Sequence, residues 1–345
     1  MRQLLDTRSA GLIGRESAAA ELESLLREKR LVTVVGPGGV GKTALAAQVG
    51  GRLLDEPWAA AGTADLAPLD VPGLVPHSLA RALRIDGSTA LPQLPALADA
   101  IGRRPMLLVV DTCDRRAEEC GETLAQLVEA CPALHVLATS RIPLAASDTF
   151  PLASPAPDTG VQLLTSAARE AGATEDPDPD LARRICAALD GLPLALRIAG
   201  GQLAHRDADD LLTLIGRPDQ LLDLPAPMPG LPYRLRTLRG SLCWSVRLCS
   251  PGERLLWARA GVFTGPFTRD DALTVCADER LPPDDLVLAF DGLANHSLLT
   301  PGPPGTFRMS AATRAYGKQM LELLGEDAEF RRRALTHCLQ NALTP

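Results

Sequence analysis

Residues 31–43 read LVTVVGPGGVGKT, and this stretch decides the fold. LVTVV is a short β-branched run that predicts a buried strand. The following GPGGVGKT (36–43) fits the pattern G-x-x-x-x-G-K-[ST] of a phosphate-binding loop. Residues 43–54, TALAAQVGGRLL, predict a helix. A glycine-rich loop between a strand and a helix lets backbone N–H groups and the helix N-terminus surround phosphate oxygens.

This loop predicts both a nucleotide site and a metal site. Lys42 is expected to bridge the β- and γ-phosphates, and Thr43 to ligate Mg²⁺. The cofactors expected are therefore ATP or ADP with Mg²⁺. The loop residues expected to contact the nucleotide are Gly36, Gly38, Gly39, Val40, Gly41, Lys42, Thr43 and Ala44.

Three further residues complete the expected site. MLLVVD (106–111) predicts a strand that ends in Asp111, the expected second metal ligand. Hydrolysis also needs a group that orients water, and Asp114 is the nearest carboxylate, because Thr112 follows Asp111. Arg141 ends the predicted strand at 135–140 and is expected to point toward the ligand crevice and to sense the γ-phosphate.

The first 153 residues alternate strands with helices, which predicts an α/β domain with a parallel sheet. Helices are expected at 19–30 and 117–131, and weaker strand candidates lie at 59–66 and 149–152. The predicted fold class is therefore a P-loop NTPase sheet with helices on both faces, followed by an all-α domain and a winged-helix domain.

After residue 153 the pattern becomes helical. Residues 154–160 and 225–232 predict linkers, so the expected domains are 1–153, 154–230 and 231–325, with a helical tail at 326–345. The middle domain is expected to contain helices at 160–171, 179–190, 193–205 and 208–216. The third is expected to contain helices at 235–248, 251–260, 268–277, 283–295 and 311–324, with short strands at 297–300 and 306–309.

Composition excludes several classes of protein. The 345 residues contain 35 Lys+Arg and 42 Asp+Glu, and a net charge of −7 argues against whole-surface binding to nucleic acid or anionic lipid. No apolar run is long enough for a membrane span, and the N-terminus lacks a secretory signal, so a cytoplasmic protein is expected. The eight cysteines contain no C-x-x-C pair, which argues against a zinc site.

Seven segments together resemble the NB-ARC branch of the STAND nucleotide switches, as found in bacterial SARP-type and LuxR-type transcriptional regulators. They run in the family's order and cover roughly residues 10–325: LIGRE (12–16), GPGGVGKT (36–43), ADLAPL (64–69), LLVVDTCD (107–114), ACPALHVLATSRIPL (130–144), LDGLPLAL (189–196) and 237–268. The resemblance implies that Ile13, Gly14 and Arg15 line an adenine pocket, that Arg141 is the sensor arginine, and that Pro193 packs against the nucleotide.

The chain departs from this family at three places. Thr112 replaces the usual acid or amide after Asp111, and Asp114 stands where many relatives have Glu. Met309-Ser310-Ala311 occupies the position of a Met-His-Asp motif, so the His and Asp that would read ADP are missing. This last departure affects the expected coupling between the winged-helix domain and the nucleotide.

The predicted function is a regulatory ATP/ADP switch that hydrolyses ATP slowly at most, opens its domains under nucleotide control and self-associates in the ATP state. DNA contact is expected only through a domain outside this chain, because the predicted helix at 283–295 carries three Asp residues and no Arg or Lys. Two alternatives remain open: a degenerate nucleotide-binding scaffold for partners, and a P-loop metabolic enzyme such as a small-molecule kinase.

Overall fold

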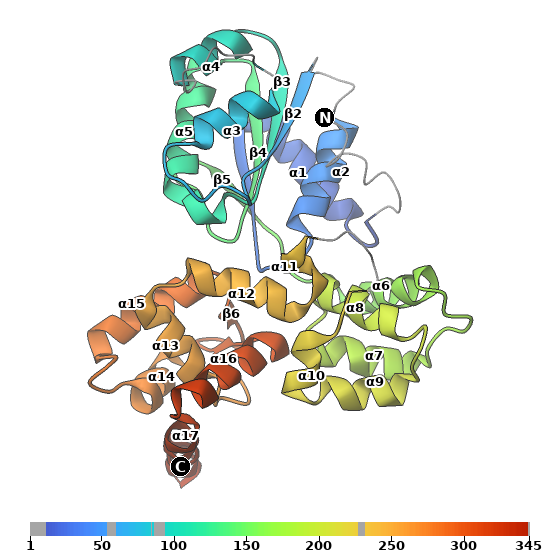
Figure 1. The fold of residues 1–345 in the computed structure, drawn as a ribbon, viewed down its shortest axis with the longest axis vertical. Helices are drawn as coiled ribbons and strands as arrows, with labels where there is room; N and C mark the ends of the chain where they lie inside the picture. Colours follow the sequence, from blue (N-terminus) through green and yellow to red (C-terminus); the bar gives the residue numbers. More distant parts are fainter. Residues whose placement is uncertain (1–11, 54–59, 84, 86–93, 227–231, 344–345) are drawn as a thin grey trace. The chain divides into compact units, whose positions relative to one another are not determined.

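The computed structural model describes residues 12–53, 60–83, 85, 94–226 and 232–343. The chain divides into two compact units, the first comprising residues 1–36 and 40–153 and the second residues 37–39 and 154–345. The first unit contains a five-stranded sheet, and the second is almost entirely helical (Figure 1).

The sheet of the first unit is parallel throughout, in the order β2-β3-β4-β1-β5. Its strands are β1 (Leu31–Val35), β2 (Ala60–Asp65), β3 (Met106–Asp111), β4 (Leu134–Ser140) and β5 (Asp148–Pro151). Strands β1, β3 and β4 each lie between two neighbours, and they are mostly apolar and buried, as the sequence predicts. The weaker candidates β2 and β5 form the two edges.

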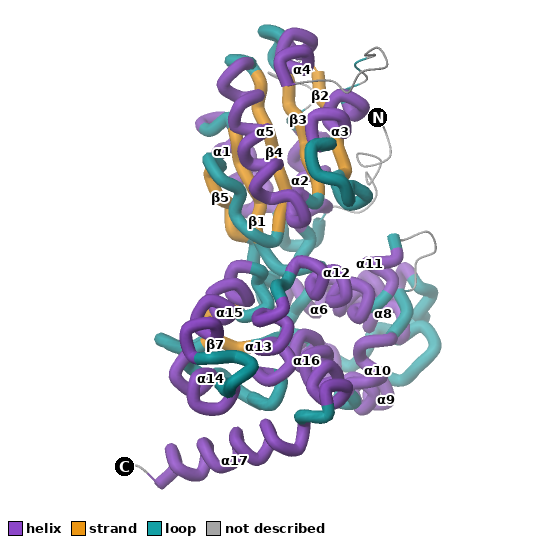
Figure 2. The backbone as a smooth tube through the Cα atoms, turned by 60° about the vertical axis from the view of Figure 1, so that its left-hand side comes forward, coloured by secondary structure: helices purple, strands orange, loops and turns teal. Residues whose placement is uncertain are grey.

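Helices cover both faces of this sheet, which confirms the predicted fold class (Figure 2). Helices α1 (Glu16–Glu28) and α2 (Lys42–Arg52) lie on one face, and α3 (Val75–Ala82), α4 (Leu94–Ile101) and α5 (Ala117–Ala130) lie on the other. A short 3₁₀ helix, η1 (Cys113–Arg116), connects β3 to α5.

The second unit begins with five helices, α6 (Pro157–Glu170), α7 (Pro179–Ala188), α8 (Pro193–Gln202), α9 (Ala208–Ile215) and α10 (Pro218–Asp223). The linker predicted at 154–160 is too long, because Pro157 occupies the first position of α6, where proline costs no hydrogen bond. Helix α10 has only six residues and was not expected. Most of the linker predicted at 225–232 lies outside the described residues.

The remaining elements follow the predicted order. They are α11 (Tyr233–Arg236), α12 (Leu238–Leu248), α13 (Pro251–Ala260), α14 (Arg269–Cys276), α15 (Pro283–Asn295), β6 (Thr300–Pro301), β7 (Phe307–Arg308), α16 (Ala311–Leu324) and α17 (Asp327–Leu343). Strands β6 and β7 form an antiparallel hairpin of two residues each, shorter than predicted. No helix in the described part of the chain has the length and apolarity needed to cross a membrane.

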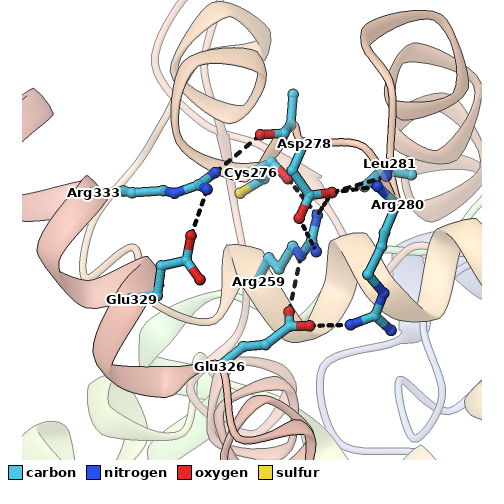
Figure 3. A network of polar contacts seen from close by, with 9 residues as sticks. Arg259, Cys276, Asp278, Arg280, Leu281, Glu326, Glu329 and Arg333 are labelled. Carbon is cyan, nitrogen blue, oxygen red and sulfur yellow. Dashed lines mark hydrogen bonds and ion pairs between the residues drawn. The ribbon is translucent and has the colours of Figure 1, made fainter.

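A buried arginine joins α17 to the rest of the second unit (Figure 3). Arg259 on α13 is fully buried, and its guanidinium donates to both carboxylate oxygens of Asp278, at 2.8 and 2.6 Å, and to Glu326 Oε2 at 3.2 Å. It also lies 4.4 Å from the ring centre of Phe330 on α17. Removal of this cation would leave the Asp278 carboxylate without its two-pronged partner, whereas Glu326 would keep its ion pair with Arg280.

We therefore expect Arg259→Ala to lower the free energy of unfolding by about 3–5 kcal/mol, the usual cost of breaking a buried ion pair. Urea unfolding followed by circular dichroism measures this difference. Arg183→Ala is the matched control, because the Arg183–Asp180 pair is exposed and should contribute less than about 1 kcal/mol. Equal losses in the two variants would contradict a structural role for Arg259.

Candidate nucleotide-binding site

The phosphate-binding loop connects β1 to α2, as the sequence predicts. Gly36 must be glycine, because a Cβ atom there would lie 2.4 Å from the carbonyl oxygen of Leu152. Gly41 has φ +103° directly before α2, a conformation that residues with a side chain rarely adopt. The two glycines therefore position the loop backbone and the N-terminus of α2 for an anion.

Lys42 is the first residue of α2, and its ammonium group donates to the carbonyl oxygen of Gly36 at 2.7 Å. Burial lowers the pKa of Lys42 to about 8, with Asp114 and Asp111 opposing that shift and Arg141 adding to it. These four ionisable groups therefore lie close enough to influence one another. A phosphate bound here would restore the protonated form of Lys42.

Asp111 lies at the carboxyl end of β3 and is only 3% exposed. Its Oδ1 accepts hydrogen bonds from the hydroxyls of Thr43, at 2.7 Å, and Thr139, at 2.6 Å. Its Oδ2 accepts the hydroxyl of Thr112 at 3.2 Å. The two predicted metal ligands, Thr43 and Asp111, are thus in direct contact, and hydroxyl and carboxylate oxygens are the donors that Mg²⁺ prefers.

Asp114 and Arg141 form a buried pair in the same site. The backbone N–H of Arg141 donates to Asp114 Oδ1 at 2.5 Å, and its Nε lies 3.5 Å from Asp114 Oδ2. The side chains are 5% and 8% exposed, respectively. Because Arg141 engages both oxygens of Asp114, this carboxylate positions the arginine, whereas the sequence suggested it only as a base for water.

Arg15 also lies beside the loop. One of its terminal guanidinium nitrogens, Nη2, donates to the carbonyl oxygens of Val40, at 3.1 Å, and Ala153, at 2.8 Å. Burial lowers the pKa of Arg15. Ile13 and Gly14 form the turn that precedes α1, so they lie next to Arg15 in the first unit.

Pro193 is the first residue of α8 in the second unit. The helix predicted at 193–205 is therefore confirmed as α8, and contact between Pro193 and a nucleotide stays a prediction.

The structure adds residues that the sequence analysis did not select. Thr139 on β4 donates to Asp111 and accepts the backbone N–H of Thr112 at 3.0 Å. Thr112 has φ +62°, an uncommon conformation for a β-branched residue. Asp65 ends β2 directly opposite Asp111. The sequence signal that points to these residues is a polar side chain at the end of each predicted parallel strand. Such ends lie along one edge of the sheet, so their side chains come together.

The stretch Met309-Ser310-Ala311 is the N-terminus of α16, within the second unit. Ser310 caps this helix by accepting the N–H of Thr313 at 3.1 Å. Asp190, which has φ +53°, accepts the N–H of Ala311 at 2.7 Å and pairs with Arg308 at 3.2 Å. A carboxylate from the loop between α7 and α8 therefore contacts the start of α16, where the sequence itself supplies no acid.

His296 is not exposed on the surface. Its Nε2 lies 3.5 Å from Glu253, whose carboxylate also accepts the backbone N–H of Ser250 at the start of α13. Cys249 lies in the same cluster, and the possible ligand atoms are within 4.8 Å of one another. The capping role of Glu253 accounts for this cluster without a metal.

Comparison with known proteins identifies relatives in mycobacteria. The chain is 31% identical over 317 residues to Rv0890c of Mycobacterium tuberculosis, named as an HTH-type transcriptional regulator; the match covers 89% of this chain and 35% of the relative. It is 32% identical over 276 residues to the uncharacterized protein Rv0894 of the same species, covering 78% of this chain and 69% of that protein. No protein-family model matches the sequence.

Solved structures with the same fold include a Walker-type ATPase and a protein solved with adenine nucleotides. The ATPase PABY2304 of Pyrococcus abyssi superposes with a TM-score of 0.62 at 17% identity, covering 91% of this chain and 99% of that one. The ORC2 protein of Aeropyrum pernix, solved as ADPNP and ADP complexes, has a TM-score of 0.54 at 14% identity, with 98% of each chain covered. The likeness shows that this chain has a P-loop ATPase fold.

The lowered pKa of Lys42 predicts a pH-dependent affinity for ADP. In the empty site about nine tenths of Lys42 is neutral at pH 9 and about one tenth at pH 7, and only the protonated form attracts phosphate. We therefore expect the Kd for ADP to rise about tenfold from pH 7 to pH 9, as measured by isothermal titration calorimetry. A Kd unchanged between these pH values would contradict the buried environment of Lys42.

Proposed function

The chain belongs to the family of the mycobacterial protein Rv0894, and we propose that it is a nucleotide-controlled switch of the NB-ARC/STAND class. In this proposal it binds ATP or ADP with Mg²⁺ and couples the bound nucleotide to the arrangement of its domains. The observation that carries the proposal is the contact of Thr43 with Asp111 beside Lys42, with Arg141 close to that lysine. These are the groups that a Mg²⁺-nucleotide requires.

A role for each residue follows from its contacts. The loop amides and Lys42 hold the β-phosphate, which ATP and ADP share. Thr43 and Asp111 hold Mg²⁺, and Thr139 orients Asp111. Arg141 is the group that distinguishes the nucleotides, because only ATP offers a γ-phosphate that competes with Asp114 for the guanidinium.

The pairing of Asp114 with Arg141 supports slow hydrolysis. A carboxylate that accepts a hydrogen bond through one oxygen and pairs with a guanidinium through the other is poorly placed to orient a water molecule. Slow turnover suits a switch, since each nucleotide state must last long enough to be read. A metabolic kinase would instead need an acceptor site and rapid turnover.

The regulatory context of the proposal comes from the relatives. Rv0890c carries the name of an HTH-type transcriptional regulator, and the chain spans about a third of its length. We propose that the switch acts within such a regulator in the cytoplasm, self-associating in the ATP state, with DNA contacted by another part of the regulator. The acidic residues Asp284, Asp285 and Asp291 on α15 support this division of labour.

Nucleotide binding is tested first with Lys42→Ala. Loss of the buried ammonium group should cost about 2–5 kcal/mol of binding free energy and raise the Kd for both ADP and Mg-ATP about thirtyfold or more. Lys29→Ala is the matched control, because Lys29 forms an exposed pair with Asp148 and should leave binding unchanged. Wild-type protein that binds neither nucleotide would refute the proposal. Identical small-angle scattering with ADP and with a non-hydrolysable ATP analogue would favour the alternative of a degenerate nucleotide-binding scaffold that does not change shape with the nucleotide.

The role of Asp114 is tested with Asp114→Asn. The amide still accepts the N–H of Arg141 but lacks the charge that attracts its guanidinium, so Arg141 becomes available to a γ-phosphate. We expect the ratio of the ADP Kd to the ATP Kd to rise about tenfold. The ratio is informative because an indirect effect on Lys42 changes both affinities together.

Asp70→Asn controls for the loss of an exposed carboxylate in the same unit. An unchanged ratio together with abolished hydrolysis would show that Asp114 is the catalytic base instead.

A further inference from the structure

An apolar groove lies within the second unit, away from the phosphate-binding loop in sequence. Its volume is about 690 Å³, in the range of small-molecule sites. Its walls come from the end of α7, from α9 and α10, from the segment after α13, and from α16 and α17. Helices α10 and α16 pack side by side (Figures 1 and 2).

The floor of the groove is apolar. Leu212, Ile215 and Leu221 contribute from α9 and α10, and Val262 contributes from the turn after α13. Small residues leave the space open; they are Ala188, Gly216, Gly261, Ala311 and Ala315. This part of the groove therefore favours a ligand with an apolar surface over a ligand with a polar surface.

Cations dominate the rim. Arg314 and Lys318 lie one turn apart on α16, and Arg331 lies on α17, whereas Asp327 is the acidic residue of the lining. Asp327 pairs with Arg331, at 2.9 Å. Lys318 is 3.9 Å from Glu322, which is outside the lining. The rim therefore carries an excess of positive charge above an apolar floor.

Arg314 is the decisive residue of this rim. It is half-buried, and its Nη1 donates to the backbone carbonyl of Thr264 at 2.9 Å. Across the described ranges of the chain, Arg314 is in no ion pair. A half-buried guanidinium without a carboxylate partner is an anion site, since its planar donors match a carboxylate or phosphate group.

We propose that this groove binds an amphipathic anion, a small molecule with an oxyanion head and an apolar tail. Arg314 and Lys318 hold the head, and the tail covers Leu212, Ile215 and Val262. The walls come from segments on both sides of residues 227–231, so an occupant bridges the helices before and after this point. The lining of this site contains no residue of the phosphate-binding loop.

Decanoate and decyl phosphate are suitable probes, because they share one tail and differ in the oxyanion. Isothermal titration calorimetry on the full chain without nucleotide, below the micellar range, should show saturable binding of at least one of them. The tighter of the two identifies the head as carboxylate or phosphate. Decan-1-ol has the same tail without charge and should bind at least about tenfold more weakly.

Two variants test separately how the head and the tail of the ligand contribute to binding. Arg314→Gln should weaken the preferred probe about tenfold and reduce its advantage over decan-1-ol. Gly216→Leu should abolish binding of all three, because a Cβ at this position meets nothing closer than 3.4 Å and the side chain has room to fill the groove. Arg332→Gln, an exposed arginine of α17 outside the lining, is the matched control.

The proposal is overturned if neither anion binds, if decan-1-ol binds as tightly as the anions, or if Arg314→Gln and Arg332→Gln behave alike. Thermal unfolding of each variant shows whether it remains folded, and Arg314→Gln carries the test if Gly216→Leu does not fold. Because the protein is free of nucleotide, failure here leaves the proposed switch untouched, and loss of ADP binding in Lys42→Ala leaves the groove untouched.

Discussion

The nucleotide site depends on four ionisable groups within the first unit, the buried residues Asp111, Asp114 and Arg141 and the partly buried Lys42 beside them. Two cations balance two carboxylates, so the empty site tolerates their burial. The sheet makes this possible, because β3 and β4 are adjacent and parallel and the chain places an acid or arginine after each. A bound Mg²⁺-nucleotide would replace these internal partners with phosphates and a metal.

Much of the first unit could be predicted from the sequence because its signals are local. Buried strands such as 106–111 are continuous apolar runs, and the phosphate-binding loop has fixed spacing. The errors concern helices whose start is marked by proline. Pro157 falls in a predicted linker and Pro218 in no predicted element, yet both begin helices. Packing against neighbours decides whether a segment as short as the six-residue α10 is helical.

The sequence predicts candidate residues for the site one at a time, but it does not predict the contacts between them. Asp114 and Arg141 are 27 positions apart, and their pairing depends on the turn of η1 and on the register of β3 against β4. Thr139 was visible only as part of a strand end. Its hydrogen bonds to Asp111 and Thr112 come from the same register. Local sequence thus identifies the candidates, and tertiary structure decides which of them interact.

Residues 309–311 lack the expected motif, but a carboxylate from another segment contacts them. The sequence there lacks the His and Asp of the motif, which predicts weakened coupling between the winged-helix domain and the nucleotide. In the structure, Asp190 accepts the N–H of Ala311 and pairs with Arg308, so a carboxylate occupies this helix start from another element. Asp190 lies three residues before Pro193 of the GLPL turn, so one hydrogen bond joins this turn to the start of α16 and one ion pair joins it to Arg308 of β7. A polar connection therefore exists at the start of α16 although the stretch itself carries no acid.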